Sequence, residues 1–279
     1  MEKAELIASK VGDLPALPQV AVKVMEMVRD PNTRTKDLEE VLLRDPALTA
    51  KILRISNSAF YGVRGTVSTL SRSIVILGFN TLRSIVMASS TEEIYKRSTN
   101  FKEKILWEHS LAVALAARAI AKECRYPASE EAFVGGLLHD IGKVAMDSNM
   151  SEEYQLVMER VYNDNATFVD AETDVIGFDH TEIGAVIVGR WNLTAELQEA
   201  VRLHHQPMSA EVDPTLVAII SLANSLCVKN GLGPERNPEL DLGDLESTLM
   251  LPIDPARLDD LAGEIVEKLD EEKKLLSVA

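Results

Sequence analysis

The stretch Gly-Gly-Leu-Leu-His-Asp-Ile-Gly-Lys-Val, residues 135–144, sets an imidazole beside a carboxylate in an otherwise apolar, glycine-containing segment. Burying such a pair costs free energy unless other groups satisfy both. Neighbouring residues of a straight helix point about 100° apart, so His139 and Asp140 can face one point only where a helix end meets a groove. Lys143 lies one turn further on, where it would hold an anionic substrate oxygen or neutralise Asp140.

Helical patterns extend from this stretch in both directions. Apolar residues recur at helical spacing, and Asp-Pro pairs at 45–46, 213–214 and 254–255 are typical of helix N-termini. Thr35 is a candidate N-cap, and Gly78 is a candidate for the position that follows a helix C-terminus. No stretch alternates with period 2, so the sequence predicts an all-α protein.

The chain divides into helical units along its length. Five short helices are expected in the first ninety or so residues, before a polar segment at 92–104. A second unit follows, and one of its helices is predicted over 133–146. The tail from 231 to 279 has two weaker helices and ends in a charged run.

Composition is that of a globular protein: 46% of the 279 residues are apolar and 26% are charged. We expect a cytoplasmic protein, because no apolar run is long enough to cross a bilayer and no secretory signal pattern begins the chain. Cys124 and Cys227 form no ligand pattern and are predicted to be buried free thiols. The net charge of −15 disfavours nucleic acid and anionic membranes as partners.

The histidines indicate a metal site. The chain has five, His109, His139, His180, His204 and His205, and each falls on or beside a predicted helix. One histidine alone would carry little information. Helical bundles, however, build divalent metal sites from imidazoles and carboxylates on several facing helices, and four helices here bring such groups.

The order of these residues resembles the HD superfamily of metal-dependent phosphohydrolases, with spacing similar to its HD-GYP phosphodiesterases. More specifically, the chain resembles the HDOD family, the HD-related output domain of bacterial signalling proteins. The motifs that carry this resemblance, over about residues 8–230, are Leu14-Pro15-Ala16-Leu17-Pro18, Asp45-Pro46-Ala47-Leu48, Asn57-Ser58-Ala59-Phe60-Tyr61-Gly62, Leu77-Gly78, Glu172, Gly177, Asp179-His180, Gly184 and Trp191-Asn192-Leu193.

The resemblance implies a small orthogonal helical bundle, residues 8–100, packed against an HD-like helical bundle, residues 101–230, with residues 231–279 as a C-terminal extension packing on the core. It implies a mononuclear or dinuclear site for Fe, Mn or Zn. The implied metal ligands are His109, His139, Asp140, His180, His204 and His205. Asp140 and Lys143 are the implied catalytic residues.

Three departures from the HD pattern bear on activity. The pattern usually ends with an aspartate on a later helix, and Asn224 stands at that place here. An amide oxygen can coordinate a hard cation, but it is neutral and weaker. The Gly-Tyr-Pro element is absent, since Gln206-Pro207-Met208 follows His205. Ile105 replaces a glutamate of some relatives, which argues against a three-metal site.

Three functions are therefore compared. The first is a signalling module that binds partner proteins or a ligand and retains part of the HD metal pocket. The second is an active phosphohydrolase acting on a nucleotide or cyclic dinucleotide, in which the metal orients the phosphate. The third, nucleic-acid binding by residues 35–56, has only four basic residues in its favour: Lys36, Arg44, Lys51 and Arg54.

Overall fold

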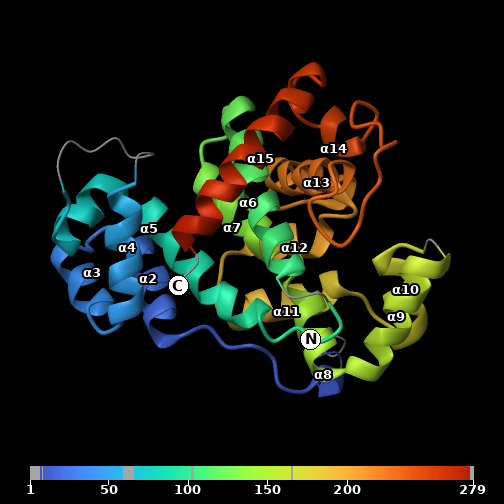
Figure 1. The fold of residues 1–279 in the computed structure, drawn as a ribbon, viewed down its shortest axis with the longest axis horizontal. Helices are drawn as coiled ribbons and strands as arrows, with labels where there is room; N and C mark the ends of the chain where they lie inside the picture. The colour runs from blue at the N-terminus through green and yellow to red at the C-terminus, as the bar shows by residue number, and fades with distance from the viewer. Residues whose placement is uncertain (1–6, 8, 59–65, 102–103, 165, 277–279) are drawn as a thin grey trace. The chain divides into compact units, whose positions relative to one another are not determined.

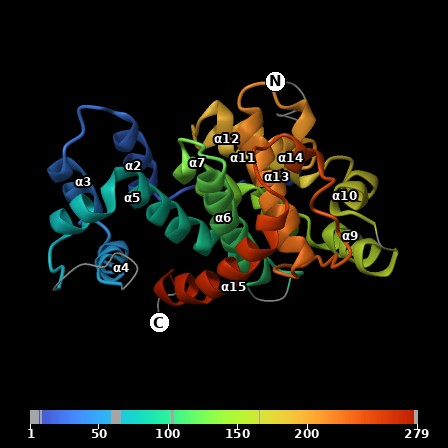
Figure 2. The ribbon, with the colours of Figure 1, turned by 90° about the horizontal axis from the view of Figure 1, so that it is seen from above.

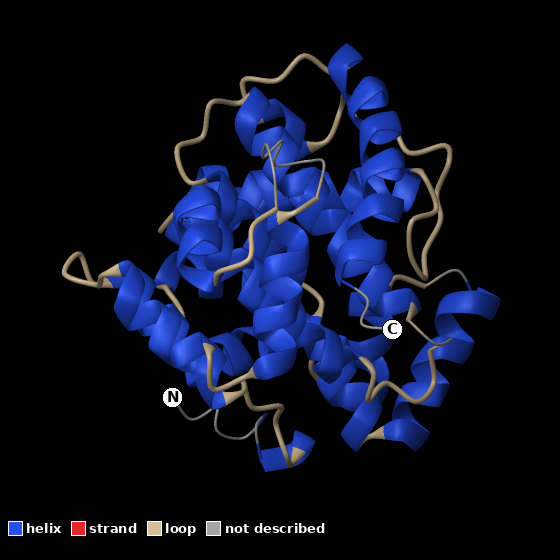
Figure 3. Ribbon diagram, turned by 60° about the vertical axis from the view of Figure 1, so that its left-hand side comes forward, coloured by secondary structure: helices blue, strands red, loops and turns tan. Residues whose placement is uncertain are grey.

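The computed structural model describes residues 7, 9–58, 66–101, 104–164 and 166–276. Helices and loops make up this part of the chain, and no strand occurs in it (Figure 3). The predicted all-α class is confirmed. The predicted motif at 57–62 lies largely outside the described residues.

The chain separates into two compact units, and both are discontinuous in sequence. One contains residues 1–16 and 94–266, and the other contains residues 17–93 and 267–279. We call them the histidine unit and the small unit. The expected division into 8–100, 101–230 and 231–279 stays a prediction.

The small unit is a set of amphipathic helices. Its elements are α2 (Gln19–Arg29), α3 (Thr35–Leu42), α4 (Pro46–Ser56), most of α5 (Leu70–Tyr95) and the second half of α15 (Ala256–Leu276) (Figure 1). The Asp45 carboxylate caps α4 by accepting a hydrogen bond from the Leu48 amide at 3.0 Å, as the Asp-Pro pair predicts. Thr35 is not the cap of α3 but its first residue. The N-cap is Arg34, whose amide donates to the Asp37 carboxylate at 3.0 Å.

Helix α5 is interrupted at Gly78, where φ is 75° and ψ is 163°, a conformation that favours glycine. Its length and composition would let it cross a membrane, but 56% of its most apolar window is buried within the protein. Burial of that extent is typical of a core helix. Lys51 is also buried, 4% exposed, and its ammonium lies 3.1 Å from the Glu92 carboxylate. One of the four basic residues considered for nucleic acid is therefore withdrawn from the surface.

The histidine unit contains the remaining helices. They are α6 (Ile105–Glu123), α7 (Ser129–Leu138), α8 (Ile141–Asn149), α9 (Ser151–Asp164), α10 (Phe168–Ile176), α11 (His180–Arg190), α12 (Ala195–Leu203), the 3₁₀ turn η2 (Pro207–Ser209), α13 (Pro214–Lys229), α14 (Glu246–Leu249) and the first half of α15 (Ala256–Leu276). Cys227 is buried and Cys124 is half-buried, and both are free thiols.

Helix α6 packs against α7 and α13, and the three lie side by side in Figure 2. Helix α11 packs against α8 and α12. Glycine makes two of these approaches close. A side chain at Gly136 would come within 2.8 Å of the α6 backbone at Ala114, and one at Gly142 would overlap the carbonyl of His180. Gly136 and Gly142 thus let neighbouring backbones approach closely, whereas Gly135 faces the side chain of Ile220.

Candidate metal centre

His139 and Asp140 lie at a junction between two helices. Helix α7 ends at Leu138 and α8 begins at Ile141, and Asp140 leaves the helical conformation with φ of −101° and ψ of 11°. The prediction of one helix over 133–146 is therefore wrong. Because the helix breaks between them, both side chains can turn toward the same interior point.

This point collects every histidine in the chain. The potential ligand atoms form two groups, and within each group they lie within 4.8 Å of one another: one group is His109, His139 and Asp140, and the other is His180, His204 and His205. His109 comes from α6, His180 is the first residue of α11, and His204 and His205 follow the end of α12. All are buried except His205, which is exposed.

Asp140 connects the two groups. Its Oδ2 lies 3.4 Å from Nε2 of His139 and 3.7 Å from Nε2 of His109. Its Oδ1 lies 3.4 Å from Nε2 of His180 and 3.9 Å from Nε2 of His204. The two oxygens of one carboxylate thus face different groups of imidazoles, as a bridging ligand would.

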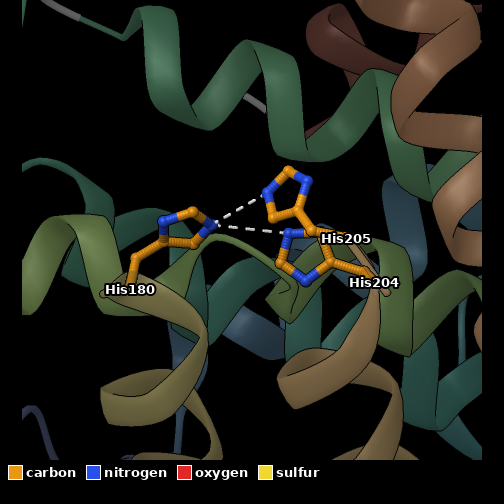
Figure 4. A group of neighbouring side chains, drawn as sticks. All are labelled: His180, His204 and His205. Carbon is orange, nitrogen blue, oxygen red and sulfur yellow. Dashed lines mark hydrogen bonds between the residues drawn. The ribbon is translucent and has the colours of Figure 1, made fainter. Parts of the chain in front are cut away.

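The second group is drawn in Figure 4, where the rings of His204 and His205 both face that of His180. Nε2 of His180 lies 3.2 Å from Nε2 of His205 and 3.5 Å from Nε2 of His204. Three imidazole nitrogens from two helix ends therefore converge on one place.

Backbone carbonyls set the tautomer of three rings. Nδ1 of His109 donates a hydrogen bond to the Leu232 carbonyl at 2.6 Å. Nδ1 of His139 donates to the Gly136 carbonyl at 2.7 Å, and Nδ1 of His204 donates to the Val201 carbonyl at 2.8 Å. A carbonyl can only accept, so Nδ1 carries a proton in each ring, and in the neutral form of the ring the lone pair on Nε2 is left for the interior of the site. Metal-binding histidines are usually held this way.

Glu172 does the same for His180. Its Oε2 accepts from Nδ1 of His180 at 2.7 Å and from the backbone amide of the same residue at 2.8 Å. Its Oε1 accepts from the hydroxyl of Tyr154 at 2.8 Å. Glu172 and Tyr154 are fully buried. Glu172 was visible in sequence only as a family mark, and the signal for its role is an acidic residue eight positions before a histidine.

The charges of the site follow from burial and proximity. Burial opposes ionisation of Asp140, but His139 and Lys143 outweigh it and hold the pKa of this carboxyl well below its usual range. Burial lowers the pKa of His109 to about 4 and that of His204 well below 6.5. Burial also acts to lower the pKa of His180, but the Glu172 carboxylate raises it overall.

Lys143 is occupied by this centre. Its ammonium, 2% exposed, donates to Oδ2 of Asp140 at 3.0 Å and lies 4.4 Å from the centroid of the Phe168 ring. Burial opposes its charge, but Asp140 and then Glu235 and Glu172 raise its pKa. The arrangement matches the neutralising role considered for it, and its catalytic role stays a prediction.

Two buried atoms test whether a metal would fit. Within the described part of the chain, Nε2 of His139 and Oδ1 of Asp140 have no hydrogen-bond partner. Buried polar atoms without a partner are unfavourable, and a cation bound between them would satisfy both. Nitrogen and carboxylate donors of this kind suit divalent transition metals. The residues present therefore fit such an ion, and the six predicted ligands are brought together.

Asn224, on α13, belongs to the same place. Its Oδ1 lies 3.1 Å from Nε2 of His109, and the residue is 8% exposed. The sequence suggested Asn224 for a position next to the ligands, and the structure places it there.

The turn at Leu232–Gly233 was not foreseen. Besides the Leu232 carbonyl, Gly233 contacts the ring of His109, and a Cβ atom there would overlap its Nδ1. Gly233 has φ of 155°, which favours glycine. No sequence motif links this turn to His109, which lies 123 residues earlier.

Two cavities open at the exposed edge of the centre. The larger, of about 460 Å³, includes Phe168 and Glu235 in its walls, and we call it the Phe168 cavity. The smaller, of about 270 Å³, includes Glu246, and we call it the Glu246 cavity. They share His205, Asn224 and Ser225, so both border residues of the candidate metal centre.

Comparison with known proteins places this geometry in a family. The sequence model of the HDOD domain family matches residues 14–207 of this chain. A protein of Treponema pallidum, described as uncharacterized, is 26% identical over 223 residues. That similarity covers 79% of this chain but 43% of the relative, so the chain spans less than half of that relative's length.

Solved structures of other proteins share the fold of this chain. An HDOD domain protein of unknown function from Geobacter sulfurreducens has a TM-score of 0.86 at 26% identity, covering 98% of this chain and 96% of its own. A protein from Shewanella amazonensis, named as a candidate phosphohydrolase, has a TM-score of 0.80 at 27% identity and 98% coverage of both chains. A protein from Marinobacter aquaeolei named for signal transduction has a TM-score of 0.77 at 20% identity, which shows a shared fold.

Proposed function

Because this chain belongs to the HDOD domain family, we propose that it is a cytoplasmic signal-transduction protein whose histidine centre binds a divalent transition metal, Fe, Mn or Zn, and that it acts mainly by binding a ligand and partner proteins. His109, His139, Asp140, His180, His204 and His205 would hold the metal, in one or two positions. A bound divalent ion would anchor an acidic group of the ligand.

One observation carries this proposal: four imidazoles have Nδ1 tied to a fixed acceptor and Nε2 turned toward a common centre. Histidines that only satisfy a core have no need to bring their free lone pairs together. The second observation is the pair of buried atoms without partners, Nε2 of His139 and Oδ1 of Asp140, within the described residues.

A phosphohydrolase is the second candidate. It is favoured by the cavities that reach His205, which give a substrate access to one side of the centre. The neutral amide of Asn224 speaks against it, because it supplies no charge to a hard cation. The ammonium of Lys143 would also have to leave Asp140 before it could hold a phosphate.

Metal analysis tests the proposal. Protein purified without chelators should contain a transition metal, measured by inductively coupled plasma mass spectrometry. The His139→Ala variant purified in the same way should contain none. Cys124→Ser and Cys227→Ser are matched controls that remove the other soft ligands and should retain the metal. Metal-free protein that takes up none on titration would contradict the proposal.

Turnover separates the two candidates. The metal-loaded protein is incubated with a panel of phosphate monoesters, nucleotides and cyclic dinucleotides, and release of product is followed. Metal without turnover favours the signalling module. Turnover that Asp140→Ala abolishes would make the phosphohydrolase the correct assignment.

A further inference from the structure

The Phe168 cavity has the composition of a ligand site. Its volume of about 460 Å³ falls within the usual range for small-molecule pockets. Apolar walls come from Phe168, Val228 and Leu240, and neutral hydrogen-bonding groups come from Gln206 and Asn237. His205 and Asn224, two residues of the candidate metal centre, also line it.

Its charge is unusual for a site that faces a metal. Among the described residues, the one acidic side chain in the lining of the Phe168 cavity is Glu235, and in the lining of the Glu246 cavity it is Glu246. No lysine or arginine among the described residues lines either cavity. The protein as a whole carries a net charge of −15. A ligand with several phosphates would therefore find no cationic side chain in the lining of either cavity to offset its charge.

The buried ammonium of Lys143 does not supply the positive charge that the two cavity linings lack. Lys143 is absent from the lining of both cavities, and its ammonium is bound to Asp140 at 3.0 Å and covered by the Phe168 ring at 4.4 Å. Asp140 is the first charge partner of this ammonium, and Glu235 acts on it less than Asp140 does. Glu235 is half-buried, so its charge is less screened than that of a surface glutamate.

The geometry points to a small zwitterionic ligand for this cavity, with an acidic group bound at the metal beside His205 and Asn224 and a cationic amine held near Glu235. This inference rests on the proposed metal centre and names the ligand class that the centre serves. The neutral amides of Gln206 and Asn237 would hydrogen-bond the part between the two charges. Nucleotides and cyclic dinucleotides, which carry negative charge and no compensating amine, fit this site poorly.

A matched pair of probes tests it. Protein loaded with Mn²⁺ is titrated by calorimetry with 2-aminoethyl phosphate and with ethyl phosphate, which share the phosphate monoester and differ in the amine. We expect the amine to tighten binding about tenfold. Glu235→Gln should reduce the difference to within about twofold, whereas Glu239→Gln, an exposed change on the same segment outside the cavity lining, should leave it intact.

The outcomes are distinguishable. If the wild-type protein takes up no Mn²⁺ or other transition metal, the proposed metal centre fails and this inference fails with it. If it takes up metal but binds both esters equally, or prefers ethyl phosphate, only the ligand class is wrong. A preference for the amine that persists in Glu235→Gln would also overturn the assignment of Glu235.

Discussion

Nε2 of His109 lies 3.1 Å from Oδ1 of Asn224, and as these two side chains are placed both atoms are hydrogen-bond acceptors. His109 has already given its only proton, on Nδ1, to the Leu232 carbonyl, and burial lowers its pKa to about 4, so the ring is neutral at pH 7. Turning the amide would offer a donor, and a cation would use both lone pairs. Binding of a cation beside His109 should therefore depend on which side chain occupies position 224.

Asn224→Asp should tighten metal binding. The carboxylate adds a negative charge beside His109 and the side chain keeps its size, so affinity for Mn²⁺ or Co²⁺ should rise by roughly tenfold or more. Titration of metal-free protein measures this. Asn32→Asp, an exposed change in the small unit, adds the same charge away from the centre and should have no effect. Unchanged affinity in Asn224→Asp would mean that residue 224 does not touch the metal.

Gly233→Ala should weaken metal binding. The added methyl group would overlap Nδ1 of His109 and the backbone conformation disfavours it, so the ring must move. Disturbing a group that orients a metal ligand typically costs about 10–100-fold in affinity. The absorption spectrum of bound Co²⁺ reports whether His109 still coordinates.

Gly263→Ala is the control for that change, because nothing lies within 4 Å of a Cβ atom built there. It should leave both the Co²⁺ spectrum and the affinity as in the wild type. Wild-type behaviour of Gly233→Ala would show that the turn at Leu232–Gly233 does not position His109.

Glu172→Gln should weaken the other group of ligands. The substitution keeps the size of the side chain but removes the carboxylate charge that accepts the hydrogen bond from Nδ1 of His180 and so holds its ring in place. We expect about a 10–100-fold loss of metal affinity. Tyr154→Phe removes only one hydrogen bond to Glu172, so its effect should be smaller. Equal titration curves for wild type and Glu172→Gln would exclude an orienting role for this carboxylate.

Removing the metal should destabilise the protein. An ion present at about 100 times its dissociation constant stabilises the folded state by about 2.7 kcal/mol. For a chain of this size that corresponds to a fall of about 5–10 °C in Tm when a chelator is added, followed by calorimetry or circular dichroism. His139→Ala, which cannot hold the metal normally, should show little response to the chelator. An unchanged wild-type Tm would argue that the buried lone pairs are satisfied without an ion.

The helical class and the convergence of the histidines could be predicted because both depend on patterns carried by the chain itself. Apolar spacing and the cap at Asp45 specify local structure, and five histidines on helices suggest a shared centre. The break at His139–Asp140 could not be read, because Ile141 and the residues after it continue a helical pattern. The sequence also does not show the tertiary packing at this place, where Gly142 closely approaches the start of α11.

Contacts that orient the ligands were harder to predict for a different reason. Three of the four groups that accept a hydrogen bond from a histidine Nδ1 are backbone carbonyls, those of Gly136, Val201 and Leu232. Every residue type supplies such a carbonyl. Their identity depends on where the chain passes, which the sequence does not mark. Glu172 is the exception, since its acceptor is a side chain and the sequence already marks it as one of the residues that carry the family resemblance.

The turn at Leu232–Gly233 also has a consequence for how this domain is delimited. The family match ends at residue 207, before Asn224, before the turn and before Glu235. A fragment trimmed to the match would keep all five histidines and still lose the acceptor that holds His109. Relatives aligned only over the shared profile can therefore look identical at the centre and differ in the segment that finishes it.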